Sequence, residues 1–133
     1  EEHSCLLGTD AVRDGVDVPG RSLRLIVLDR VPWNQPSILD RARRQAFGKG
    51  QWQDMMVRLK LRQAFGRLIR RADDRGVFVV LDSRLASRFG TAFPPGVAIE
   101  RLGLVDAIEA VSAFLRLPES SVAPTPGVSP SSR

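Results

Sequence analysis

The chain has 133 residues, which suits one domain of ordinary size, and 43% of them are hydrophobic, enough to bury a core. Its single cysteine, Cys5, excludes an internal disulfide, and Cys5 with the lone His3 does not have the spacing of a zinc site. No apolar run approaches the roughly 18 to 20 residues of a membrane span, so we expect no membrane partner and a cytoplasmic location.

Three short apolar segments predict buried strands, the second and third of them rich in branched side chains. These segments are 5–9, 23–30 and 76–82. The residues between the first two segments carry glycines and a proline and predict a loop over 11–20. A small edge strand is expected over 96–102.

Helical patterns alternate with these segments. Ser37 is a plausible N-cap for a helix over 38–47, which Gly48 and Gly50 would close. Asp54 is a plausible cap for a long helix over 55–72, a short helix is expected over 84–89, and an amphipathic one over 105–115.

Strands that are apolar on both faces and separated by helices favour an α/β fold, with a mostly parallel sheet of three to four strands flanked by helices. From Pro118 onward the composition is dominated by Pro, Ser, Ala, Thr and Gly. We therefore expect a domain over 1–117 and a disordered tail over 118–133.

The net charge of +5 is unevenly distributed. Residues 41–75 contain eleven Lys or Arg and three Asp or Glu, a local charge of +8. A polyanion, either nucleic acid or a nucleotide, is the natural partner of such a segment. A solvated, arginine-rich helix surface would carry the same charge, and charge alone leaves both interpretations open.

The long helix over 55–72 has two distinct faces when it is projected down its axis. A core face is predicted for Val57, Leu61, Ala64, Phe65, Leu68 and Ala72. A polar face holds Lys60, Gln63, Arg67 and Arg70, with Gly66 beside it. Because guanidinium groups match phosphate oxygens, the polar face predicts a phosphate-binding edge; a surface helix with paired or solvated arginines is the alternative.

Residues 63–70 fit the pattern Q-x-x-G-R-x-x-R and resemble motif VI of the superfamily-2 helicases. The stretch continues with a D-x-G turn, a strand and an Asp-x-Arg ending, which resembles the DinG/XPD-type branch. Upstream, GTDAVRDGVDVPG at 8–20 resembles motif V of the same branch. The resemblance implies a partial C-terminal RecA-like domain, of the P-loop NTPase type.

The resemblance also assigns roles to the motif VI residues. Arg67 and Arg70 would reach the γ-phosphate of ATP, and Arg70 is favoured as the arginine finger. Gln63 and Gly66 would line the same nucleotide cleft.

In motif V, Gly15 and Asp17 would sit at that cleft, while Thr9 and Arg13 would contact a DNA phosphate. For Asp17 the alternative is a turn-capping aspartate, and for Thr9 a strand-end hydroxyl.

The parent enzyme implied by the resemblance is an ATP-dependent DNA helicase that moves along single-stranded DNA, using ATP with Mg²⁺. No G-x-x-x-x-G-K-[ST] loop occurs here, so we expect the phosphate loop and the Mg²⁺ ligands in an N-terminal helicase domain absent from this chain. The isolated chain is then predicted to be inactive. The alternative is a stand-alone basic module that binds nucleic acid without catalysis.

Two further features of the sequence stay open. The basic segment at 38–53 either contacts DNA or forms a solvated helix. Trp33 and Trp52 either stack on bases or pack against the fold, and packing is favoured.

Overall fold

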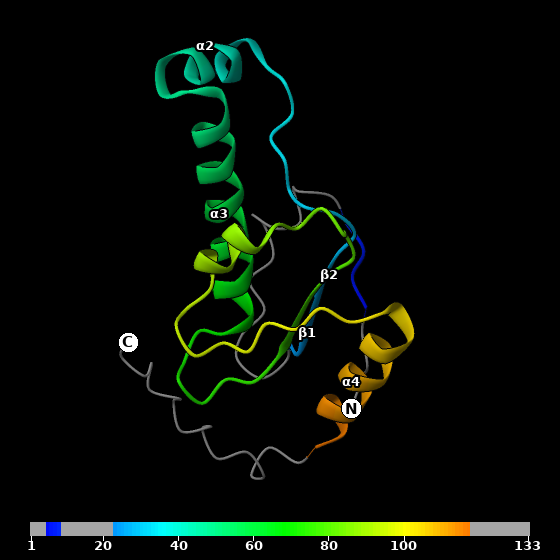
Figure 1. Ribbon diagram of the computed structural model, residues 1–133. Coiled ribbons are helices and arrows are strands. Elements are labelled where there is room, and N and C mark those ends of the chain that lie inside the picture. The colour runs from blue at the N-terminus through cyan, green and yellow to red at the C-terminus, as the bar shows by residue number, and fades with distance from the viewer. Residues whose placement is uncertain (1–4, 9–22, 118–133) are drawn as a thin grey trace, which may run out of the picture.

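The computed structural model describes residues 5–8 and 23–117. Its sheet consists of β1 (Leu25–Leu28) and β2 (Val77–Val80), which run in parallel with Leu25 opposite Val77. Parallel neighbours require a long crossover connection, and here the crossover is helical (Figure 1). The predicted alternation of strands and helices around a parallel sheet is therefore confirmed.

The expected strand count is wrong for the described residues, which form a two-stranded sheet rather than one of three to four strands. Residues 5–8 adopt no strand, and the Leu7 side chain is 90% exposed. Residues 96–102 form an irregular connection instead of an edge strand. A strand needs a neighbouring backbone to pair with, and neither segment finds one among the described residues.

Two consecutive helices make the crossover. The first, α2 (Ile38–Phe47), begins as predicted, because the Asp40 N–H donates to the Ser37 hydroxyl at 3.0 Å. Gly48 has a φ of 85°, which glycine adopts at little cost, and turns the chain into α3 (Lys49–Leu68). The predicted cap at Asp54 and the predicted end at 72 are both wrong.

The core lies between α3 and one face of the sheet. Its buried residues are Val31, Val57, Leu61, Phe89 and Ala92, against which Leu28, Phe78 and Val80 pack. Phe89 and Ala92 come from η2 (Ser87–Ala92), a 3₁₀ helix three residues later than the short helix predicted. On α3, the predicted core face holds for Val57, Leu61, Ala64 and Leu68. Phe65 is only half-buried, and Ala72 is exposed and lies beyond the helix end.

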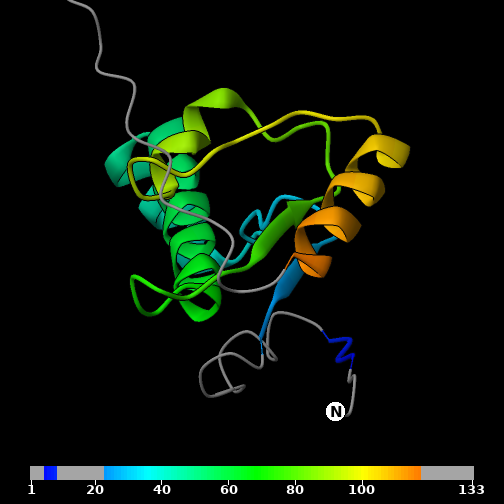
Figure 2. The same ribbon diagram turned by 90° about the horizontal axis from the view of Figure 1, so that it is seen from below.

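The last helix, α4 (Leu104–Arg116), lies on the opposite side of the sheet from α3 (Figure 2). It is attached through Arg24, whose guanidinium donates to the Leu115 carbonyl at 2.7 Å, and through Arg75, whose guanidinium lies 5.0 Å from the Phe114 ring. Its predicted apolar stripe is only partly covered, since Val105 and Ile108 are exposed in the described structure.

Candidate functional site

The last two turns of α3 carry two of the side chains that were predicted to hold a phosphate. Gln63 and Arg67 are four residues apart, and therefore share one face of the helix. Gln63 is exposed and Arg67 is half-buried. This face adjoins the buried face that holds Ala64 and Leu68, so the packed half of α3 fixes its direction.

Arg70 does not lie on the helix, which corrects the predicted arc of four polar residues. The backbone N–H groups of Arg70 and Arg71 both donate to the Asp74 carboxylate, each at 2.8 Å. These two hydrogen bonds end the helix at Leu68 and lower the pKa of Asp74 below its ordinary value. The position of the Arg70 backbone is thus determined by its hydrogen bond to Asp74 and not by the helix.

Asp74 was not predicted as a site residue, although the D-x-G pattern contained the signal. The glycine of that pattern, Gly76, packs directly under the buried Leu68 side chain. The turn from α3 into β2 is therefore stabilised at both ends. The Asp74 carboxylate binds the backbone at its start, and Gly76 packs against Leu68 at its end.

The sheet register shows which segments lie together. Leu25 at the start of β1 is opposite Val77 at the start of β2, and the Val77 N–H donates to the Arg24 carbonyl at 2.9 Å. Because the strands are parallel, the segments that lead into them enter at the same edge of the sheet. The Arg70–Gly76 turn enters β2 there, and the described chain enters β1 beside it at Leu23.

At the other edge of the sheet, Asp82 joins the ends of the two strands. Its carboxylate accepts the Val31 N–H at 2.9 Å and pairs with both arms of the Arg84 guanidinium. These hydrogen bonds, that of Arg84 first, hold the pKa of Asp82 well below its ordinary value. The Asp-x-Arg pattern therefore has a structural role in the described residues.

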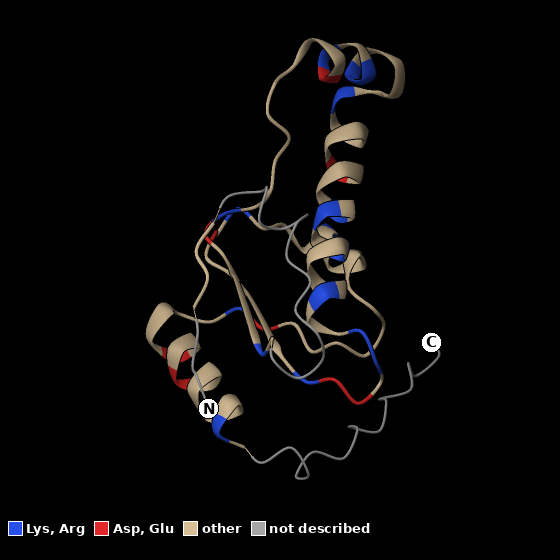
Figure 3. Ribbon diagram, turned by 180° about the vertical axis from the view of Figure 1, so that it is seen from behind, with Lys and Arg blue, Asp and Glu red and all other residues tan. Residues whose placement is uncertain are grey.

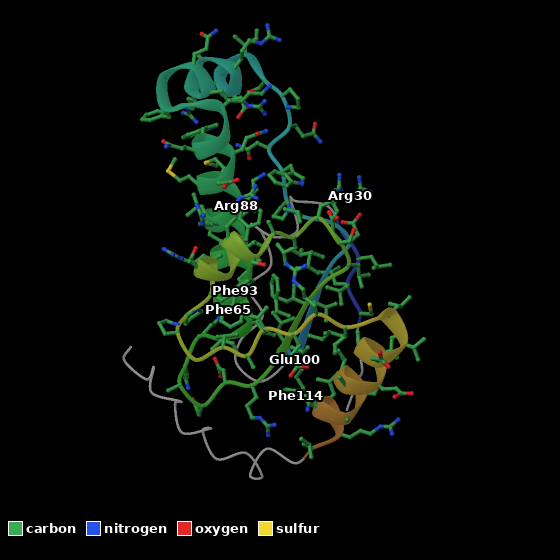
Figure 4. All side chains as sticks on the ribbon, in the orientation of Figure 1. Arg30, Phe65, Arg88, Phe93, Glu100 and Phe114 are labelled. Atoms are coloured by element: carbon green, nitrogen blue, oxygen red, sulfur yellow. The ribbon has the colours of Figure 1, made fainter. Side chains whose placement is uncertain are left out.

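A shallow apolar groove of about 710 Å³ lies between α3 and residues 90–99. Its walls include Phe65 and Phe93, whose rings meet edge to face with centroids 5.4 Å apart (Figure 4). Of the predicted site residues in the described part, only Gly66 lines this groove. Gly66 itself is open to this side, since an added Cβ there would meet no described atom within 4 Å.

The described residues offer no group of three or more His, Cys, Asp or Glu side chains that could hold a metal ion. Within the same residues, none of the helices has the length and hydropathy needed to cross a membrane. The chemistry of Gln63, Arg67 and Arg70 is that of anion binding, by hydrogen-bond donors and positive charge.

Residues 1–98 match the family model described as "Helicase C-terminal domain". The chain belongs to this family. The matched part includes both strands, α2, α3 and η2 of the helicase C-terminal domain, and it ends before α4. Among solved structures, none matches the chain.

The relatives of this helicase C-terminal domain are of the DinG type. It is 44% identical over 93 residues to the ATP-dependent helicase DinG of Mycobacterium tuberculosis (strain H37Rv), covering 64% of this chain and 14% of that protein. It is 39% identical over 101 residues to the ATP-dependent DNA helicase YoaA of Escherichia coli K12, covering 68% and 16%. The chain thus spans less than a fifth of the length of these relatives.

The capping role of Asp74 in the helicase C-terminal domain predicts a pH dependence. Its lowered folded pKa means that its contribution to stability is complete above the ordinary pKa of 3.8 and is lost as the pH falls through the folded value. We expect Asp74→Asn to lower the free energy of unfolding at neutral pH, and the difference from the unchanged protein to shrink in acid.

The measurement is urea unfolding of both proteins at a series of pH values. Asp73→Asn is the matched control, because Asp73 is the exposed neighbour and makes no hydrogen bond in the described part of the chain. A difference that stays constant from neutral pH to strong acid would show that the Asp74 carboxylate does not hold the turn.

Proposed function

We propose that this chain is the C-terminal, RecA-like motor portion of an ATP-dependent DNA helicase of the DinG type. In this role Arg67 and Arg70 extend to the γ-phosphate of an ATP molecule held mainly by a preceding N-terminal domain. Gln63 and Gly66 border the same cleft. The proposal includes a domain over residues 1–117 and a cytoplasmic location; residues 118–133, expected from the sequence to form a tail, lie outside the described part of the chain.

The observation that carries this proposal is the shared edge of the sheet. The Arg70–Gly76 turn and the start of β1 lie side by side there, and the motif V pattern at 8–20 directly precedes β1 in the sequence. Residues 9–22 lie outside the described part of the chain, and their position in the sequence, just before β1, supports a composite site for nucleotide and DNA at this edge. Gly15 and Asp17 are proposed for the nucleotide side, and Thr9 and Arg13 for the DNA side.

The arginines are suited to phosphoryl transfer because negative charge spreads over the phosphoryl oxygens as the terminal bond breaks. A guanidinium placed there stabilises that charge without gaining or losing a proton, since its pKa is far above neutrality. Mg²⁺ would neutralise phosphate charge when bound. Its ligands are assigned to the N-terminal domain, because the described residues hold no suitable acidic cluster.

The test is ATP turnover by two preparations, the full-length protein and the 133-residue chain. We expect the full-length protein to hydrolyse ATP faster when single-stranded DNA is added. The chain alone is expected to bind DNA weakly, in a salt-sensitive way, and to show no turnover. Sustained hydrolysis by the pure chain, or none by the full-length protein, would contradict the proposal.

A further inference from the structure

The crossover helices form an arm, residues 38–62, which packs on the core through Val57 and Leu61 at its α3 end and projects beyond the sheet at its α2 end (Figure 1). The arm contains seven Lys or Arg and two Asp, and its basic residues are distributed along both helices (Figure 3). Both aspartates are paired: Asp40 with Arg44 at 2.7 Å, and Asp54 with Arg88 of η2 at 2.6 Å. The arm therefore presents a surplus of positive charge.

The elbow between α2 and α3 is rigidly built. The Trp52 indole N–H donates to the Asp40 carboxylate at 2.9 Å, inside a contact where Asp40 is only 6% exposed. Burial raises the pKa of Asp40, but the hydrogen bond from Trp52 and the charge of Arg44 outweigh it, and the pKa is lowered overall. Asp40 thus stays ionised and holds the two helices together.

The structure shows whether the two tryptophans are available to stack on bases, which the sequence left open. Trp52 is buried in the elbow, and Trp33 meets the Phe89 ring edge-on in the core, with centroids 5.7 Å apart. Both tryptophans pack against the fold, as favoured. The exposed aromatic residue of the arm is instead Phe47, the last residue of α2.

Phe47 stacks on Trp52 with ring centroids 5.7 Å apart and an interplanar angle of 21°, yet its side chain remains 60% exposed. The Arg43 guanidinium lies 5.2 Å from the same Trp52 ring. Lys49 follows Phe47 by two residues and forms no ion pair with any described residue. A supported, exposed ring among cations has the properties of a base-stacking platform.

From this arrangement we infer that the tip of the arm binds single-stranded nucleic acid, with a base on Phe47 and the backbone phosphates near Arg43 and Lys49. This contact is additional to the motif V contact and rests on the proposed function. The alternative occupant of the arm tip is a protein, because the apolar Leu39 is also exposed on α2. The surplus of positive charge favours the polyanion, since Arg44 and Arg88 already neutralise both acidic side chains of the arm.

The test uses the full-length protein and a fluorescein-labelled oligothymidine, with affinity read by fluorescence anisotropy over a range of salt concentrations. Phe47→Ala is expected to weaken binding about 10-fold, and Phe47→Trp to bind within about twofold of the unchanged protein. Arg43→Ala is expected to reduce the slope of log affinity against log salt by about 0.7. Leu39→Ala is the matched control at 58% exposure and is expected to change nothing.

ATP turnover measured without DNA distinguishes a failure of the arm contact from a failure of the proposed function. We expect it to be unchanged in Phe47→Ala. If the unchanged protein binds the oligonucleotide and Phe47→Ala binds it equally well, only the arm contact is overturned. If Phe47→Ala and Leu39→Ala both lower turnover without DNA while affinity is kept, the arm packs on protein and the inference is also overturned. If the unchanged protein binds no DNA, the proposed function fails as well.

Discussion

Replacing Arg67 with Ala in the full-length protein is expected to lower the rate constant of ATP hydrolysis by about 10³-fold, the lower end of what an arginine finger contributes. Arg67 lies on the packed, second half of α3, so its guanidinium is carried by a helix whose adjoining face is fixed in the core. The loss should fall on turnover, while the Michaelis constant for ATP changes only a few-fold, because the charge it stabilises develops in the transition state.

Arg70→Ala is expected to reduce turnover by a similar factor, because Arg70 is proposed as the arginine finger and Arg67 as its neighbour in the same site. Arg71→Ala is the matched control: Arg71 is exposed and shares the Asp74 carboxylate through its backbone, which the substitution leaves in place. Turnover by Arg67→Ala and Arg70→Ala equal to that of Arg71→Ala would remove both arginines from the reaction.

Gly76→Ala is expected to lower the free energy of unfolding by about 2 to 3 kcal/mol. An added Cβ would lie 2.4 Å from Cδ1 and 2.6 Å from Cγ of Leu68, well inside contact distance. Leu68 is 2% exposed and packed in the core of α3, so it has little room to yield. Urea unfolding at neutral pH, with the denaturant slope checked for constancy, measures the change.

Gly66→Ala is the matched control, ten residues earlier in the chain. A Cβ there meets no described atom within 4 Å, and alanine favours the helix, so stability is expected to rise by up to about 1 kcal/mol. Its ATP turnover is nevertheless expected to fall, because the proposed cleft brings another surface close to this position. Unfolding of Gly76→Ala at the same urea concentration as the unchanged protein would refute the packing argument.

The sequence predicted those elements whose signals are local. Ser37 caps α2 by a hydrogen bond within one turn, and the buried positions of α3 follow the helical repeat. The crossover of helices between two apolar strands was sufficient to predict a parallel sheet. The motif VI pattern located Gln63 and Arg67 on one helical face, as the structure has them.

The errors arose where distant or competing contacts decide. Residues 5–9 are apolar enough for a strand, but hydrophobicity does not supply a pairing partner, and residues 5–8 have none among the described residues. The helical pattern continues to 72 in the sequence, and arginine is a good helix former. The Asp74 carboxylate takes the N–H groups of Arg70 and Arg71 instead, a competition that propensity alone does not rank.

In the arm, too, a contact between residues distant in the sequence decides which side chain is buried. Trp52 and Phe47 are both aromatic residues in a basic segment, and the sequence does not say which one the elbow buries. The hydrogen bond from Trp52 to Asp40 decides it, twelve residues apart along the chain. The motif pattern was therefore enough to predict the helix. That Phe47 is the exposed ring follows only from the packing of the elbow.

The most direct measurement of the central claim, that Arg67 and Arg70 bind the terminal phosphate of ATP, is nucleotide affinity in the full-length protein. A non-hydrolysable ATP analogue and ADP are each titrated against the unchanged protein and against the Arg67→Ala and Arg70→Ala variants. We predict that the unchanged protein prefers the ATP analogue by a few-fold, matching the small change expected in the Michaelis constant, and that both variants lose this preference while binding ADP normally. An undiminished preference for the ATP analogue in both variants would contradict the claim.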